Sequence, residues 1–352
     1  MFKKIQYYEN IQDMNFHLED RYFILIAEAS KNFYDHINIL QGELYGGIFP
    51  QLIFQNKNFE TGCIICTLQT NTYPILIEDI SFELEPELEN VFDETNTIFT
   101  FVDGLSPYIQ SFLEKFYEIT HSGINIIGGG AGLLTLQQEP ILFGPQGIYQ
   151  NSALLLCSQK EISLGVKHGW EKLSGPYIST STEHNILKTI DYHNAFDIYA
   201  EAIEKDSGKI INETNFFEIA KEYPLGIQLH DGEVVVRDPI ITKNGHLILV
   251  GEMDQSSTIY ILKGNKTNLI KAAKYAIGEA MQDSLVHTDT TFVVDCISRV
   301  LYLENMFQQE IETIKTQNPI AKLFGILSLG EIANKGKQYI EFYNKTCVIG
   351  AM

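Results

Sequence analysis

The run GGGAG at residues 128–132 is the stretch whose glycines could cradle a phosphate group. A dinucleotide loop needs G-x-G-x-x-G opening a helix, so that amides and helix dipole face the phosphate. Gly128 and Gly130 fit this motif, but Leu133 occupies the position of the third glycine. The lysine of a Walker loop is also absent after the glycines. The segment that follows, LLTLQQEPILFGPQGIYQ, predicts a hairpin rather than a helix. We therefore expect Gly128, Gly129 and Gly130 to mark a bend or close main-chain approach, with a ligand-cavity wall as the functional alternative.

A second group of candidates surrounds the only tryptophan. His168 lies two residues before Trp170, and its imidazole suits a haem or metal ligand or a hydrogen bond to a bound molecule, with a structural role as the alternative. His193 is the other candidate haem ligand. Cys157 as nucleophile and Asp191 as orienting acid would complete a hydrolase-like arrangement with His168 if the three lie within hydrogen-bonding reach.

Arg237 follows a strongly apolar strand, VVV. Its planar fork suits a ligand carboxylate, and the structural alternative is a pair with an internal acid such as Glu331 of the GEI segment. Asp238 is expected to order the turn before Pro239. The sequence alone leaves both roles of Arg237 open.

Five cysteines in scattered positions suggest no disulfide framework and favour a reducing cytoplasm. Cys63 and Cys66 of CIIC lie in an apolar strand, where positions three apart face opposite sides. Without a second pair to complete a zinc site, we expect them to be buried hydrophobic side chains.

The charge of the chain restricts its partners. The formal net charge is −20, from 45 acidic and 25 basic residues, and such a field repels nucleic-acid phosphates and anionic lipids. No window approaches the roughly 18 apolar residues of a membrane span. Binding to nucleic acid or to a membrane is therefore not expected.

Amphipathic helices and short apolar strands must position these candidates. Segment 106–123 has Ser106 as cap and Pro107 at its first helical position, and segment 194–208 stops near Gly208. Other predicted helices are 29–40, 267–284 and 302–317. The predicted strands are 63–68, 152–157, 162–170, 232–240, 246–253, 258–262 and 291–297.

One outline recurs three times, over residues 43–68, 124–157 and 321–352. Each copy has an apolar strand, a glycine just past its middle, a polar excursion and a second apolar strand. The pattern predicts an α+β fold of two mixed-sheet α/β halves, built from duplicated strand–glycine–hairpin–strand units in layered sheets with flanking helices. We expect domains at 20–215 and 216–352.

The order and spacing of these motifs resemble the FIST sensory family, named for F-box and intracellular signal transduction proteins. The resemblance covers roughly residues 20–350. GGGAG, FGPQGIYQNSALLLC, SLGVKHGW and DYHNAFDIYAEAI are similar to the FIST N-terminal region. EYPLGIQL, EVVVRDPI, HLILVGEM, FGILSLGEI and YNKTCVIGAM are similar to the FIST C-terminal region.

The resemblance implies an intracellular sensor of small molecules, such as amino acids. We expect a cytoplasmic sensor of an amino acid or a small carboxylate, without catalytic activity or cofactor. It also implies a separate signalling partner, such as a histidine kinase or a cyclic-di-GMP enzyme. The alternatives are a haem-based nitric-oxide sensor using His168 or His193, and a hydrolase-like enzyme. We expect the ligand between the two halves, beside residues 128–130, His168, Trp170, Arg237 and Glu331.

Overall fold

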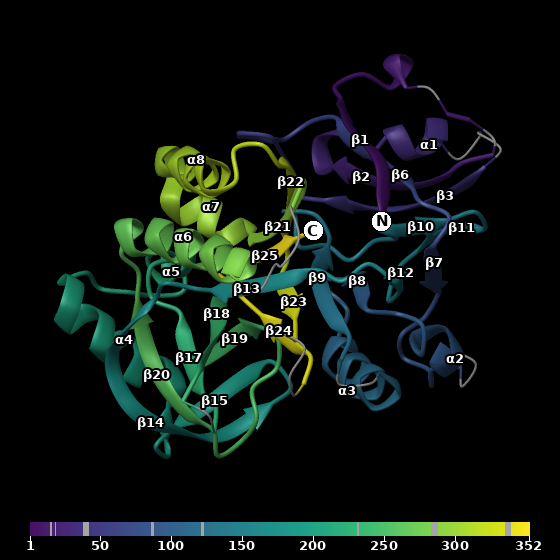
Figure 1. Ribbon diagram of the computed structural model, residues 1–352. Coiled ribbons are helices and arrows are strands. Elements are labelled where there is room, and N and C mark those ends of the chain that lie inside the picture. Colours follow the sequence, from purple (N-terminus) through teal and green to yellow (C-terminus); the bar gives the residue numbers. More distant parts are fainter. Residues whose placement is uncertain are drawn as a thin grey trace.

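The computed structural model describes residues 1–352 except 15, 18, 38–41, 86–87, 121–122, 231, 283–287 and 335–338. Within the described residues, the strands form three six-stranded sheets and one seven-stranded sheet (Figure 1). Helices α3, α6, α7 and α8 lie outside these sheets (Figure 1). The predicted α+β class with layered sheets and flanking helices is confirmed.

One succession of elements occurs three times. Each unit begins with an edge strand and then a central strand of its sheet. A helix, a strand parallel to the central strand, and a hairpin follow in that order. The last strand of the unit is antiparallel to the central strand. The first unit contains β1 (Phe2–Tyr8), β2 (Arg21–Ala27), α1 (Phe33–Ile37), β3 (Glu43–Phe49), β4 (Gln51–Phe54), β5 (Lys57–Phe59) and β6 (Cys63–Leu68). Short 3-10 turns cover Ile11–Asp13 and Glu28–Ser30.

The other two units follow the same order, and the third is interrupted after its edge strand. The second contains β7 (Thr72–Ile77), α2 (Leu88–Phe92), β8 (Thr97–Asp103), α3 (Ile109–Ile119), β9 (Asn125–Ala131), β10 (Leu142–Gly144), β11 (Gly147–Tyr149) and β12 (Ala153–Ser158). The third contains β13 (Ser163–Lys167), β21 (Thr290–Cys296), α7 (Ile297–Leu303), α8 (Phe307–Gln317), β22 (Lys322–Ser328), β23 (Glu331–Ala333), β24 (Glu341–Tyr343) and β25 (Cys347–Ala351). The strand–glycine–hairpin–strand repeat predicted from the sequence is therefore confirmed.

The three units exchange their hairpins in a cycle. β4 of the first unit pairs with β22 of the third, β10 of the second pairs with β3 of the first, and β23 of the third pairs with β9 of the second. Each six-stranded sheet thus ends in a hairpin from another unit. In these sheets, strands that precede residue 215 pair with strands that follow it. The division into domains at 20–215 and 216–352 stays a prediction.

The recurring glycine has the same register in each unit. Gly46, Gly128 and Gly325 face the central strands at Ile24, Thr100 and Val293, respectively. A Cβ atom on these glycines would lie 2.1, 1.7 and 1.9 Å from the carbonyl oxygen of the facing residue, in the same order. The expectation of a close main-chain approach is therefore confirmed. A hairpin, β10–β11, follows the glycine run, as expected.

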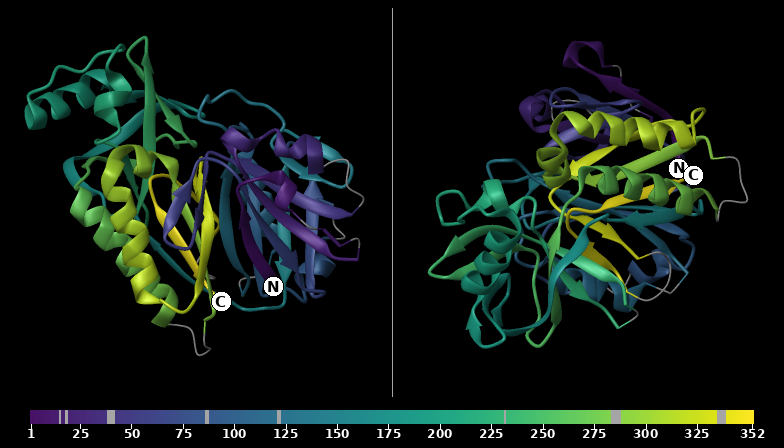
Figure 2. Two further views of the ribbon diagram at one scale, coloured as in Figure 1. Left: turned by 90° about the horizontal axis from the view of Figure 1, so that it is seen from above. Right: turned by 90° about the vertical axis from the view of Figure 1, so that its left-hand side faces the viewer.

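Alternation along the strands divides the apolar residues between two layers. On β8, Phe99 and Phe101 face a central core shared by the three six-stranded sheets, whereas Ile98 and Val102 pack beneath α3. Rings from different sheets meet in the central core, with the centroids of Phe99 and Phe292 4.9 Å apart. Viewed from above, the sheets lie as successive layers with α6 and α8 on one outer side (Figure 2).

A long insertion separates β13 from β21 and forms the fourth sheet. Its strand β14 pairs with both β20 and β15, so the sheet closes on itself; we call it the closed sheet. The insertion contains β14 (Glu171–Glu183), β15 (Ile186–Ile190), β16 (His193–Asn194), α4 (Ala195–Ser207), α5 (Phe216–Ala220), β17 (Leu225–Gln228), β18 (Val234–Lys243), β19 (His246–Val250), β20 (Thr258–Lys263) and α6 (Lys266–Gln282).

Several predicted helices differ in their bounds from the structure. Of the helix expected over 29–40, α1 covers only Phe33–Ile37. Residues 38–40 of that helix, and residues 283–284 of the helix expected over 267–284, lie outside the described residues. α3 begins at Ile109, because Ser106 Oγ accepts from the amide of Tyr108 in a turn before the helix. The helix expected over 302–317 is broken at Glu304, whose φ of 54° is incompatible with a continuous helix. A 3-10 turn, Glu304–Met306, separates α7 from α8 there. By contrast, α4 has the expected ends.

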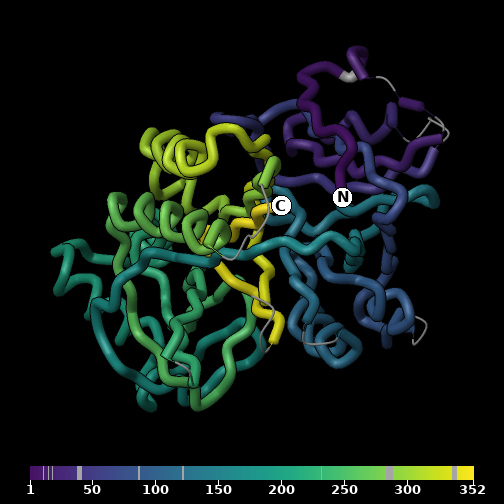
Figure 3. The backbone as a smooth tube through the Cα atoms, in the orientation of Figure 1, coloured from purple at the N-terminus to yellow at the C-terminus, as the bar shows by residue number. Residues whose placement is uncertain are grey.

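The first and third units adjoin directly at the two ends of the chain, which lie near each other in the backbone trace (Figure 3). Met1 and Met352 line the same small cavity. The amide of Met352 donates to the carbonyl of Thr290 at 3.0 Å, which fixes the end of β25 against β21.

Candidate functional site

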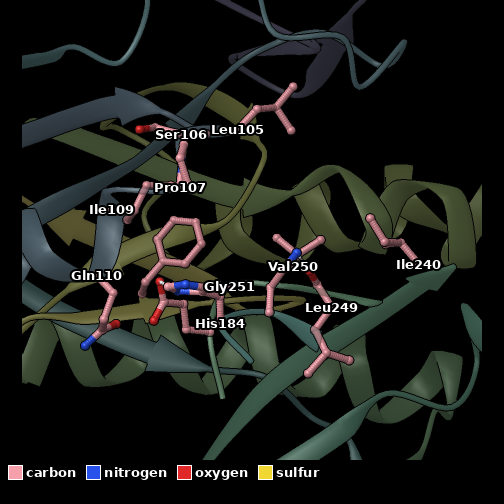
Figure 4. A pocket seen from close by; sticks show the side chains of 14 residues that line it. Leu105, Ser106, Pro107, Ile109, Gln110, His184, Ile240, Leu249, Val250 and Gly251 are labelled. Carbon is pink, nitrogen blue, oxygen red and sulfur yellow. Dashed lines mark hydrogen bonds and ion pairs between the residues drawn. The ribbon is translucent and has the colours of Figure 1, made fainter. Parts of the chain in front are cut away.

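A cavity of about 200 Å³ lies where the closed sheet meets the second unit (Figure 4). The segment after β8 supplies residues 104–107, and the start of α3 supplies Ile109 and Gln110. The β14–β15 turn supplies His184 and Asn185. Ile240 of β18 and residues 249–252 form another wall. Phe342 of the exchanged hairpin β23–β24 completes the lining. Three separate parts of the fold therefore meet at one small space.

The segment after β8 is held by a buried carboxylate. Asp103 Oδ1 accepts from the amide of Leu105 at 3.1 Å, and Oδ2 accepts from the amide of Asn151 at 2.8 Å. Gly104 fits closely behind it, since a Cβ atom there would lie 2.9 Å from the carbonyl oxygen of Ala131. Leu105 and the start of α3 are thereby fixed at the cavity edge.

The opposite wall joins two turns of the closed sheet. Asn185 Nδ2 donates to the carbonyl of Leu249 at 3.0 Å, and the amide of Leu249 donates back to the carbonyl of Asn185. Gly251 has a φ of 78°, which a side chain would strain. At the rim, His184 Nδ1 lies 3.6 Å from Glu252 Oε1.

Arg237 lies buried behind this wall and has four protein acceptors. Its Nε donates to the carbonyl of Glu252 at 2.8 Å, and Nη1 donates to the carbonyl of Phe342 at 2.9 Å. Nη1 also donates to the carbonyl of Val236, and Nη2 donates to Glu341 Oε1 at 3.3 Å. The acid that pairs with Arg237 is therefore Glu341, rather than Glu331 as the structural alternative suggested. Burial raises the pKa of Glu341, and Arg237 opposes that shift.

Glu331 faces Gly129 across the β23–β9 pair and is fully buried. Its carboxylate accepts from Ser328 Oγ at 3.1 Å and from the amide of Thr346 at 3.0 Å. Burial raises its pKa to about 8. A Cβ atom on Gly129 would lie 2.7 Å from the carbonyl oxygen of Gly330, so this glycine makes room for β23.

Trp170 and His168 meet a buried polar network at Lys345. Trp170 Nε1 donates to the carbonyl of Lys345 at 2.9 Å, and Lys345 Nζ lies 3.2 Å from Asp238 Oδ2. Arg299 Nη1 donates to the carbonyl of His168 at 2.7 Å. The expected turn before Pro239 is wrong, because Asp238 and Pro239 lie within strand β18. Asp238 instead pairs with a buried lysine.

Arg299 itself is a buried cation between two buried acids. Its Nε lies 2.9 Å from Asp295 Oδ1, and its Nη2 lies 2.6 Å from Glu310 Oε2. Lys345, Arg299, Asp295 and Glu310 are not among the residues predicted from the sequence. Glu310 falls on the predicted amphipathic helix 302–317, whereas Arg299 lies between that helix and the predicted strand 291–297. Only the i, i+4 spacing of Asp295 and Arg299 offered a local signal.

The sequence-predicted candidates occupy different places. Arg237 lies directly behind the cavity of Figure 4, and Glu331 lies on the hairpin that carries Phe342. His168 and Trp170 line a separate open groove of about 630 Å³. His193 is exposed on β16, and haem binding at either histidine stays a prediction.

The hydrolase-like arrangement is not assembled. Cys157 is buried beneath α3 and lines a third cavity, whereas His168 lines the groove. Burial raises the pKa of Cys157 to about 12, which keeps the thiol protonated. Asp191 Oδ1 accepts from the amide of Ile178, within the closed sheet. Cys63 and Cys66 are fully buried, as expected from the sequence.

Comparison with protein families gives two adjacent matches. The FIST N domain matches residues 39–193, and the FIST C domain matches residues 195–334. No curated protein matches the chain. In the part of the chain that the structure describes, none of the helices has both the length and the apolar character needed to cross a bilayer.

Proposed function

The chain belongs to the FIST family of sensory and signal-transduction domains, and we propose that it senses a small molecule held in the cavity of Figure 4. The family is sensory or regulatory rather than catalytic. The proposal places the ligand against Phe342 and the Leu249–Glu252 wall, beside the second unit.

The observation that carries the proposal is the position of Arg237. One guanidinium group holds the carbonyl of Glu252 in the closed sheet and the carbonyl of Phe342 in the exchanged hairpin. Both residues also line the cavity. A molecule bound there contacts the two walls that Arg237 joins, so occupancy favours one relative position of those walls.

Phe342 connects the cavity walls to the repeated units, so a change in the position of these walls can reach those units. It pairs with Ile332 of β23, and β23 pairs with β9 of the second unit. A shift of this hairpin alters the register or spacing of a sheet edge, and we propose that a separate signalling protein recognises the altered surface. A histidine kinase or a cyclic-di-GMP enzyme is the kind of partner that the sequence resemblance suggests.

A thermal-shift screen with two variants tests the site. Ile240→Trp fills the cavity, because Ile240 lines it, whereas the exposed neighbour Ile241 lies outside the lining and Ile241→Trp is the matched control. Amino acids, small amines and small carboxylates are the probes. A ligand of the native state raises the melting temperature as its concentration increases.

We expect at least one probe to stabilise the unmodified protein and Ile241→Trp, but not Ile240→Trp. Equal stabilisation of all three proteins would place the binding site elsewhere. No stabilisation by any probe would contradict the proposal that this cavity senses such molecules.

A further inference from the structure

We propose, on the basis of the sensor function above, that the cavity of Figure 4 takes a small apolar molecule carrying a protonated amine. The hydrogen-bonding atoms around the cavity that already have partners, and those that remain, decide the chemical class of the ligand.

Two amides at the cavity have their nitrogen atoms engaged. Gln110 Nε2 donates to Glu114 Oε1 at 2.9 Å, and Asn185 Nδ2 donates to the carbonyl of Leu249 at 3.0 Å. Because each partner is an acceptor, the amide nitrogen must face it, which leaves the oxygen and the second N–H of each amide for other partners. The two amide oxygens can therefore accept a hydrogen bond from a donor placed beside them.

Glu252 supplies the negative charge. It is the one carboxylate among the described lining residues, and its side chain is about one-third exposed, at 35%. The nearby imidazole of His184 is 79% exposed at the rim, which leaves it in contact with solvent. An ammonium group placed at Glu252 would make a charge-assisted hydrogen bond and could donate to the amide oxygens as well.

A carboxylate ligand lacks a matching cation. Neither lysine nor arginine occurs among the described lining residues, and the buried guanidinium of Arg237 is committed to Glu341 and three carbonyl groups. The formal charge of −20 adds a field that attracts cations and repels anions. Charge therefore favours an amine over a carboxylate at this site.

The remaining surface is suited to hydrocarbon. Leu105, Pro107, Ile109, Val250 and Phe342 contribute apolar side chains to the lining. Figure 4 shows Leu105, Pro107, Ile109 and Val250 around the same space. A short branched alkyl group in contact with them would bury apolar surface, while its amine reaches Glu252.

Isothermal titration calorimetry with four probes of matched shape tests this class. The probes are 3-methylbutylamine, 3-methylbutanol, 4-methylpentanoate and leucine, each titrated at neutral pH. The variants are Glu252→Gln, which removes the charge, and Glu183→Gln, which removes a nearby exposed carboxylate outside the lining. Ile240→Trp blocks the cavity.

We expect 3-methylbutylamine to bind at least tenfold more tightly than the other three probes. Glu252→Gln should weaken amine binding at least tenfold, Glu183→Gln less than twofold, and Ile240→Trp should abolish it. Tighter binding of leucine, the alcohol or the carboxylate, with loss in Ile240→Trp, would overturn the amine class but retain the sensor site. Amine binding that is indifferent to Glu252→Gln would also overturn it. Absence of binding by all four probes would overturn the inference, and the broader thermal-shift screen then decides the sensor site separately.

Discussion

Arg237 Nη1 donates to the carbonyl oxygen of Phe342 at 2.9 Å. This hydrogen bond joins β18 of the closed sheet to the hairpin β23–β24, which belongs to the third unit but pairs with β9 of the second. The two residues are 105 positions apart in the chain. The ring of Phe342 lines the candidate cavity, so this hydrogen bond lies directly behind the proposed ligand.

Replacing Arg237 should therefore weaken the fold. Arg237→Met leaves Glu341, whose side chain is 16% exposed, without its cation and leaves carbonyl groups unpaired. We expect a loss of about 2–4 kcal/mol in the free energy of unfolding, measured by urea denaturation. Lys188→Met removes only the exposed pair with Glu183 and should lower the free energy of unfolding far less than Arg237→Met does. Equal losses in the two variants would contradict the structural role of Arg237.

Gly128 should tolerate no side chain. In Gly128→Ala, the new Cβ would lie 1.7 Å from the carbonyl oxygen of Thr100, so the parallel strands must separate. We expect a loss of about 3 kcal/mol or more in the free energy of unfolding, or failure to fold. Gly278→Ala in α6 meets nothing within 4 Å and should stabilise the protein by about 0.5–1 kcal/mol. A harmless Gly128→Ala would refute the close approach.

Glu331 should make stability depend on pH. Burial raises its folded-state pKa to about 8 from the ordinary value of 4.5, so the folded protein retains a proton that the unfolded chain releases. The contribution of Glu331 to the free energy of unfolding is complete below about pH 4.5 and is lost as the pH rises through 8. Between these values the free energy of unfolding falls by about 1.4 kcal/mol per pH unit.

Glu331→Gln removes that component because the amide does not titrate. The free energy of unfolding of the variant minus that of the unmodified protein should therefore increase between pH 5 and pH 8. Urea denaturation of both proteins at several pH values measures this difference. A difference that stays constant with pH would show that Glu331 keeps an ordinary pKa.

The sequence allowed the repeated unit to be predicted, because its signals are local. An apolar strand, one glycine and a turn-rich excursion are contiguous, and the glycine at 128 or 325 marks a contact between adjacent strands. The ends of α4 were also predictable, since Asn194 and Gly208 cap it directly. Glu304 shows where local signals fail. The apolar spacing of a helix continues past residue 304, but the main chain of Glu304 is not helical, so the helix is broken there.

The exchange of hairpins and the cavity could not be predicted in the same way. Which sheet receives β23 depends on a pairing with β9 some 200 residues earlier, and strand patterns do not specify a distant partner. The same limit applies to Arg237, whose acid is Glu341 because the distant strand β24 contacts β18. The position of Phe342 at the cavity follows from that exchange.

The measurement that most directly tests the central claim is a methyl-resolved NMR titration of the full chain, labelled at isoleucine, leucine and valine, with 3-methylbutylamine. We predict the largest shift changes for methyl groups that line the cavity, namely those of Leu105, Ile109, Ile240, Leu249 and Val250. Maximal changes instead at Val166, Val234 and Leu262, which line the groove of His168 and Trp170, would contradict the assignment of the ligand to this cavity.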